Sequence, residues 1–199
     1  MVEHLQNSSL GPGGMTQQRQ RIHPHKFTLW VAMASIIMMF AGLTSAYIVK
    51  SNGANWEVVQ TPSAFIYSTI VIVVSSIIMQ MALRSFIHRS MQQYRLLLGI
   101  TWLLGIAFVA IQWFGFQWMW NHGVHFAGAS SAGQFLYIIA GLHALHVLGG
   151  VIALTVMLLQ AFFSHTRNYN RVPVEIVTTY WHFVDLLWLY LFIFFVIIK

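Results

Sequence analysis

Histidines and carboxylates set inside long apolar runs are the residues of this chain that could do chemistry. The run GLHALHVLGG carries His143 and His146 three residues apart, and the run TYWHFVDLLWLYLF carries His182 and Asp185 at the same spacing. Residues three apart lie on one face of a helix, so each pair would present its side chains together. Imidazoles in such an arrangement could bind a haem iron or a metal ion, share a proton with the carboxylate, or hydrogen-bond to a neighbouring helix.

These chemistries make different demands on the rest of the chain. A haem held by two histidines needs them on facing helices, for which His146 and His182 are the candidates, and a metal site needs three or four ligands. An imidazole beside Asp185 would keep the carboxylate ionised or share its proton. Interhelical hydrogen bonds contribute only about 0.6 kcal/mol each on average, but they fix the register of helices. We favour interhelical bonding, and keep haem or metal ligation and a proton relay as alternatives.

Aromatic residues and a second carboxylate accompany the last of these pairs. Trp181 and Trp188 lie seven residues apart, on the same helical stripe as the aspartate, and Tyr180 precedes them. Glu175 follows Arg171 by four residues just before the apolar run, which predicts a local ion pair at the membrane surface. The sequence has no nucleophilic serine turn, phosphate-binding loop or cofactor fingerprint, so we expect no active site on this chain.

The composition shows what surrounds these residues. Charged residues make up 7% of the chain and hydrophobic residues 58%, whereas a soluble domain is about 25% charged. A chain of 199 residues cannot hide that much apolar surface from water, so lipid must be its main solvent. The absence of cysteine excludes disulfides, iron–sulfur clusters and thiolate copper sites. The net charge of +6 comes from singly scattered basic residues, which argues against nucleic-acid binding.

Five apolar segments must position the polar residues. After a flexible polar tail over residues 1–26, which contains GPGG, the sequence predicts one transmembrane domain over residues 27–199. Each apolar run has about 20 residues or more, enough to cross roughly 30 Å of hydrocarbon as a helix, and none shows the alternation of barrel strands. The expected fold class is therefore all-α, an integral membrane bundle with five transmembrane helices at roughly 27–49, 62–83, 96–120, 134–163 and 178–198.

The basic residues predict how this bundle is oriented. All but Lys50 and Lys199 of the ten Lys and Arg residues fall in the tail, in the second loop or in the fourth loop. These three segments lie on one side of a five-helix bundle, and basic loops normally face the cytoplasm. We therefore predict a cytoplasmic N-terminus and a C-terminus outside.

Three stretches resemble one known family. The stretches ASIIMMFAGLTSAYIV (34–49), GLHALHVLGG (141–150) and VEIVTTYWHFVDLLWLYLF (174–192) are similar, in that order, to helices of subunit III of the haem–copper terminal oxidases, which include cytochrome c and quinol oxidases. The match is to the short five-span bacterial form, and the Tyr-Trp-His-Phe-Val-Asp run is its most specific part.

The resemblance implies a non-redox accessory subunit of a proton-pumping respiratory oxidase that reduces oxygen to water. Such a subunit sits in the bacterial cytoplasmic (inner) membrane as a multi-pass protein and packs against the catalytic subunit I and other oxidase subunits. The haems and copper belong to the partner subunits, while this chain would retain phospholipid and support proton uptake and turnover stability. A structural role, either interhelical or lining a lipid cleft, is then expected for His143, His146, Glu175, Tyr180, Trp181, His182, Asp185 and Trp188.

Two positions depart from the family pattern. Family members commonly carry a carboxylate where this chain has Ile36, and a glutamate where it has Gly115. These replacements favour packing and lipid retention over proton handling by this chain's own carboxylates. Two rival functions remain at this point: a small haem-b membrane anchor that passes electrons to or from quinone, and a channel or transporter.

Overall fold

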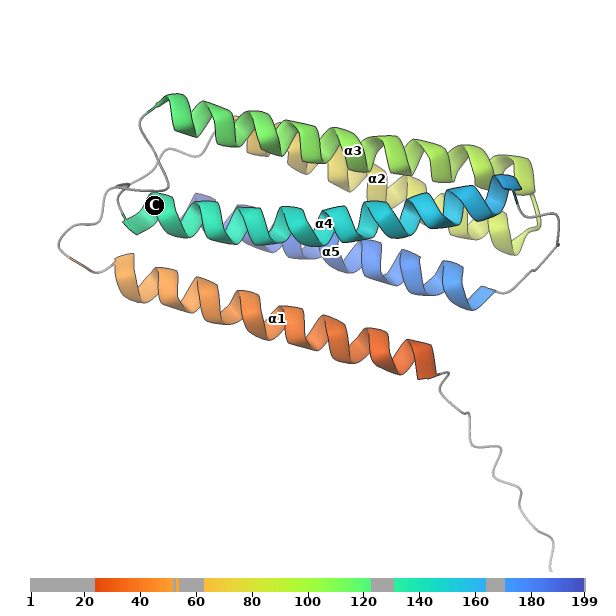
Figure 1. The fold of residues 1–199 in the computed structure, drawn as a ribbon, viewed down its shortest axis with the longest axis horizontal. Coiled ribbons are helices and arrows are strands. Elements are labelled where there is room, and N and C mark those ends of the chain that lie inside the picture. Colours follow the sequence, from red (N-terminus) through yellow and green to blue (C-terminus); the bar gives the residue numbers. More distant parts are fainter. Residues whose placement is uncertain (1–23, 52, 54–62, 123–130, 164–170, 199) are drawn as a thin grey trace, which may run out of the picture.

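The part of the chain that the structure describes is an all-helical bundle with five helices long and apolar enough to cross a membrane, as the sequence predicts. The structure is a computed structural model that describes residues 24–51, 53, 63–122, 131–163 and 171–198. Its helices are shown in Figure 1: α1 (Pro24–Ser51), α2 (Ala64–Ile87), α3 (Met91–Asn121), α4 (Ser131–Phe163) and α5 (Arg171–Ile197). Residues 1–23 of the expected tail lie outside the described residues.

All of these helices except α2 begin earlier than the apolar runs that predict them. α1 begins at Pro24, so Lys26 lies in its first turns, and α5 begins at Arg171 and includes Glu175. A proline is favourable in a first turn because its missing N–H would have no partner there. Hydropathy marks only the part of a helix that is immersed in hydrocarbon, whereas backbone hydrogen bonding continues into the headgroup layer.

α4 and α5 lie in the middle of the bundle. α2 and α3 form an antiparallel pair on one side, where α3 packs on α4 and α2 packs on α5 (Figure 1). α1 lies on the other side and contacts only α4 and α5 among the described helices. α5 is therefore flanked by α1 and α2, two helices that do not contact each other.

The turn between α2 and α3 is short. α2 ends at Ile87 and α3 begins at Met91. Arg89 adopts a φ of 61°, and its N–H donates to the carbonyl of Phe86 at 3.1 Å. A left-handed residue at the end of a helix is the usual way to reverse the chain at once. The short turn sets α2 and α3 side by side along their lengths.

Candidate functional site

The indoles of α5 hydrogen-bond to hydroxyl groups of α2. Trp181 Nε1 donates to Ser75 Oγ at 3.1 Å, and Trp188 Nε1 donates to Thr69 Oγ1 at 3.0 Å. Both indoles are buried, with 1% and 0% of their surface exposed. A buried indole N–H that lacked an acceptor would destabilise the bundle, so these bonds fix which residues of α2 face α5.

His182 makes the same kind of contact with both of its ring nitrogens. Nδ1 lies 2.7 Å from Ser76 Oγ, and Nε2 lies 3.1 Å from Gln80 Oε1. An amide oxygen only accepts, so Nε2 carries a proton, and a neutral ring then accepts from Ser76 through Nδ1. The imidazole bridges two positions of α2 that are one turn apart.

The α2 partners of this interface are residues that the sequence reasoning did not single out. They are the hydroxyl and amide residues Thr69, Ser75, Ser76 and Gln80. One signal could have found them: the pairs Ser-Thr at 68–69 and Ser-Ser at 75–76 recur seven residues apart inside an apolar run. Such spacing places all of these hydroxyls toward one side of a helix.

Trp181 also fills a slot between two glycines. A Cβ atom on Gly105 of α3 would lie 2.8 Å from Trp181 Cη2, and a Cβ on Gly150 of α4 would lie 3.0 Å from its Cε3 and Cζ3 atoms. Only glycine leaves room for the ring at these positions. Trp181 thus touches α2, α3 and α4 at once.

The two histidines of α4 behave differently from each other. His143 is fully buried, and neither ring nitrogen has a hydrogen-bond partner in the described structure. It packs against aromatic rings instead, with its centroid 5.0 Å from Trp188 and 6.0 Å from Phe108. His146 Nδ1 lies 2.7 Å from the Leu142 carbonyl of its own helix. Among the described residues, neither imidazole bonds to a neighbouring helix.

A backbone contact from Tyr180 joins α4 to α5 in their place. The Tyr180 hydroxyl donates to the carbonyl oxygen of His146 at 3.1 Å. The link therefore uses the main chain of the histidine position and is independent of the imidazole.

Asp185 lies in the interior beside the α2 interface. It is 3% exposed, and neither carboxylate oxygen has a hydrogen-bond partner among the described residues. Ser76, which bonds to His182, is the neighbouring hydroxyl. No ion pair joins His182 to Asp185 in the described part of the chain, because the imidazole is engaged by α2. The shared face predicted by their spacing does not make them partners.

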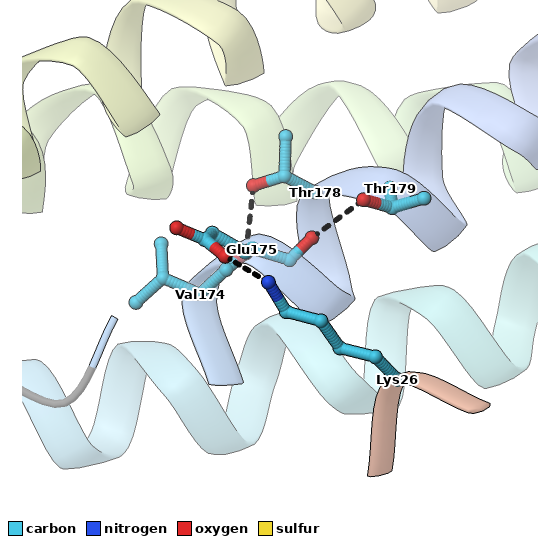
Figure 2. Close-up of polar contacts among 5 residues, drawn as sticks. All are labelled: Lys26, Val174, Glu175, Thr178 and Thr179. Carbon is cyan, nitrogen blue, oxygen red and sulfur yellow. Dashed lines mark hydrogen bonds and ion pairs between the residues drawn. The ribbon is translucent and has the colours of Figure 1, made fainter. Parts of the chain in front are cut away.

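Glu175 joins α5 to α1 at one end of the bundle. Its Oε2 lies 2.7 Å from Lys26 Nζ (Figure 2), and both side chains are about two-fifths exposed, at 38% and 40%. The expected partner was Arg171, one turn earlier on the same helix. Lys26 takes its place because α1 begins at Pro24 and brings the lysine to α5. A pair this exposed contributes at most about 1 kcal/mol.

The contacts between the helices do not identify a protein family, but comparison with known proteins does. A family model described as cytochrome c oxidase subunit III matches residues 22–198. The chain belongs to this family.

Curated relatives of the subunit III family agree over most of their length. A probable cytochrome c oxidase subunit 3 from Nocardia farcinica is 32% identical over 184 residues, which cover 87% of this chain and 90% of the relative. A protein of the same description from Mycobacterium tuberculosis is 31% identical and covers 81% of this chain and 82% of its own. The cytochrome c oxidase subunit 3 of Bacillus sp. (strain PS3) is 26% identical, with 82% and 80% covered.

Subunit III is a multi-pass membrane component of an oxidase complex, and members of this family do not themselves carry the redox cofactors. In the described residues, no three His, Asp or Glu side chains gather where they could hold a metal ion. His182, one of the two histidines considered as haem ligands, has both nitrogens engaged by α2. The haem-anchor alternative therefore receives no support from the site geometry or from the family.

The two positions expected to depart from the subunit III pattern lie in packed surroundings. Ile36 packs against the hydrophobic core. Gly115 is buried, and a Cβ atom at this position would lie 3.1 Å from Phe65 Cε1. A glutamate side chain there would have to displace the phenylalanine, so α2 and α3 pack closer than they could around a carboxylate.

Proposed function

We propose that this subunit III is a non-redox accessory subunit of a proton-pumping terminal oxidase in a bacterial cytoplasmic membrane. It packs against the haem- and copper-bearing catalytic subunit I, retains phospholipid and supports proton uptake and stability during turnover. The observation that carries the proposal is the family match, which extends over residues 22–198. The use of the indoles and of His182 to bind α2 supports a structural role, because these groups have no free atom for chemistry.

Purification in mild detergent through a tag on the N-terminal segment tests this proposal. We expect a large subunit with haem and copper spectra to co-purify with the tagged chain. An oxidase depleted of this chain should begin turnover at a near-normal rate and then lose activity faster than the complete complex. Recovery of the tagged chain alone, from membranes where the oxidase is intact, would contradict the proposal.

A variant at Asp185 tests whether this chain acts by packing and lipid retention or transfers protons through its own carboxylates. Replacing the residue with asparagine keeps its shape and removes its proton-exchanging carboxyl group. We expect the Asp185→Asn subunit to assemble and the oxidase to take up protons at the parent rate. A sharp slowing of proton uptake in a normally assembled Asp185→Asn complex would show that the carboxyl group itself serves proton transfer.

A further inference from the structure

A groove opens between α2 and α3, near the turn that joins these helices at one end of the bundle (Figure 1). Its volume is about 430 Å³, which is within the range of pockets that hold small ligands. It is lined by Met81, Ser85, Gln92, Gln93, Leu96 and Leu97. All of these residues are exposed or partly exposed, so a ligand can enter the groove from outside the bundle.

The lining of the groove changes from polar to apolar along the helices. Ser85 lies in the last turn of α2, and Gln92 and Gln93 lie in the first turn of α3. Met81 and the two leucines lie about one turn farther into the spans. The groove therefore has a polar end near the headgroups and an apolar end in hydrocarbon, which is the order of groups in a phospholipid.

The hairpin formed by α2 and α3 also carries a positive charge that it does not balance itself. Residues 63–122 contain Arg84, Arg89 and Arg95 but no aspartate or glutamate. All three arginines lie within about two turns of the junction between the helices. This junction is predicted to face the cytoplasm, and the cytoplasmic leaflet is the one whose anionic lipids attract basic residues at the membrane surface.

Arg84 is the arginine that lies beside the groove. It follows Met81 by three residues, so the two share one side of α2, and it is exposed. No carboxylate among the described residues pairs with Arg84. Arg95 is placed differently, because its guanidinium lies over the ring of Phe162 of α4, 5.5 Å from the ring centroid. The positive charge available to a ligand in the groove is therefore that of Arg84.

The length of the groove distinguishes a lipid from a protein helix as its occupant. The lining residues extend from Met81 to Ser85 on α2 and from Gln92 to Leu97 on α3, which is roughly 6–8 Å along each helix. A transmembrane helix of another protein would run along much of the roughly 30 Å of hydrocarbon. A lipid phosphate and the first part of one acyl chain match the shorter length and its change in polarity.

We propose that this groove binds an anionic phospholipid. The phosphate lies by Ser85, Gln92 and Arg84, and one acyl chain follows Met81 and Leu96 toward the middle of the bilayer. The assignment rests on the proposed function, because it names the class of phospholipid that the subunit retains and the place where it is held.

Photo-labelling of the complete oxidase in lipid nanodiscs tests the proposal. The probes are phosphatidylglycerol and phosphatidylcholine with the same photoreactive group in one acyl chain, and mass spectrometry identifies the labelled positions. We expect phosphatidylglycerol to label the chain around Met81 and Leu96 roughly fivefold more than phosphatidylcholine does. The exposed residues Leu103 and Leu145, outside the groove, should show no preference. Equal labelling of the groove by both probes, or the same preference at the control positions, would overturn the proposal.

Arg84→Gln and Arg95→Gln form a matched pair of variants, because each removes one positive charge from the same hairpin. Arg84→Gln should lower the labelling of the groove by phosphatidylglycerol roughly fivefold, the change expected when one basic residue near an anionic lipid is lost. Arg95→Gln should leave this labelling unchanged. Equal effects of the two substitutions would show a response to overall charge alone and would contradict a site at the groove.

A steric variant gives an independent measurement. Ser85→Phe places a ring in the polar end of the groove and should abolish the preference for phosphatidylglycerol, whereas Leu103→Phe should preserve it. Both positions are at least partly exposed, so both variants should keep the melting temperature of the parent. A Ser85→Phe chain that melts like the parent and keeps the preference would overturn the site.

Co-purification with the oxidase separates this inference from the function on which it rests. A chain that co-purifies with the oxidase but does not prefer the anionic probe contradicts the groove alone. A chain that does not co-purify contradicts the proposed function and the groove together.

Discussion

At the scale of single residues, Trp181 organises more of the bundle than any histidine does. Its indole N–H bonds to Ser75 of α2, while its ring lies against Gly105 of α3 and Gly150 of α4. One side chain thereby sets the distance from α5 to three other helices. A site of this kind tolerates neither a smaller ring nor a larger neighbour.

Gly105→Ala tests the tight contact with Trp181. The added methyl group would meet Trp181 Cη2 at 2.8 Å, and overpacking of this kind costs about 1–3 kcal/mol. We expect the melting temperature of the purified subunit in detergent to fall, as measured by tryptophan fluorescence.

Gly99→Ala on the same helix is the matched control for this prediction. The nearest atom to its added Cβ, Leu158 Cδ1, is 3.9 Å away, so only the helical preference of alanine acts, and it favours the variant by about 0.5–1 kcal/mol. Gly99→Ala should melt at or slightly above the parent temperature. Equal melting temperatures for the two variants would show that Gly105 is not constrained by the indole.

The residue types of the α5 motif could be predicted from the sequence, but their partners could not. A spacing of three places His182 and Asp185 on one face, yet it does not say which helix that face meets. The structure turns the imidazole to Ser76 and Gln80, which removes it from the carboxylate. His143 shows the same limit, because its aromatic neighbours Phe108 and Trp188 come from two other helices.

At the scale of elements, the interface between α2 and α5 fixes the register of the two helices. Three side chains of α5 bond to hydroxyls of α2 that lie within about one heptad of each other. Sliding one helix past the other by a single turn would break all of these bonds together. Each bond is weak, so the specificity comes from their number and spacing.

A double-mutant cycle measures one contact of this interface. Trp188→Phe removes the indole N–H and leaves a cavity, and Thr69→Val removes the hydroxyl 3.0 Å away at nearly constant volume. The cost of the cavity occurs in both the single and the double variant, so it cancels in the cycle. We expect a coupling of about 0.6 kcal/mol, and at most about 1.7, from unfolding titrations in mixed micelles. Fully additive single effects would mean that the hydrogen bond contributes nothing to stability.

Helix number could be predicted because the apolar runs are long and well separated, and the described residues hold five helices long and apolar enough to cross a membrane. Helix ends were harder to predict, because the first turns of α1 and α5 are polar and lie beyond the reach of a hydropathy argument. The partner of Glu175 was mispredicted for the same reason, because the start of α1 was placed too late. Lys26 belongs to α1, so it reaches Glu175 from another helix.

At the scale of the whole molecule, the bundle is asymmetric in both contacts and charge. α4 and α5 are central, α2 and α3 form a close pair, and among the described helices α1 contacts only the central two. No local pattern in the sequence states this arrangement, since it depends on which buried faces are complementary. The distribution of basic residues, in contrast, predicts the orientation directly from the loops.

The predicted orientation can be measured because the chain has no cysteine of its own. Single cysteines placed by His88→Cys and Asn121→Cys lie at exposed positions near opposite ends of α3. In whole cells, a membrane-impermeant maleimide should label the Asn121→Cys variant only. The His88→Cys variant should react after the membrane is opened. The reverse labelling pattern would place the N-terminus outside.

The peripheral place of α1 also orders events during synthesis of the chain. α1 leaves the ribosome first, yet the helices it contacts in the described structure, α4 and α5, begin at Ser131 and Arg171. α2 and α3 can pair at once, while α1 must wait in the bilayer as a solitary helix. A solitary α1 does not leave the Thr44 hydroxyl unpaired in the bilayer, because this hydroxyl donates to the Phe40 carbonyl of the same helix. The first helix to enter the membrane is thus among the last to find its place.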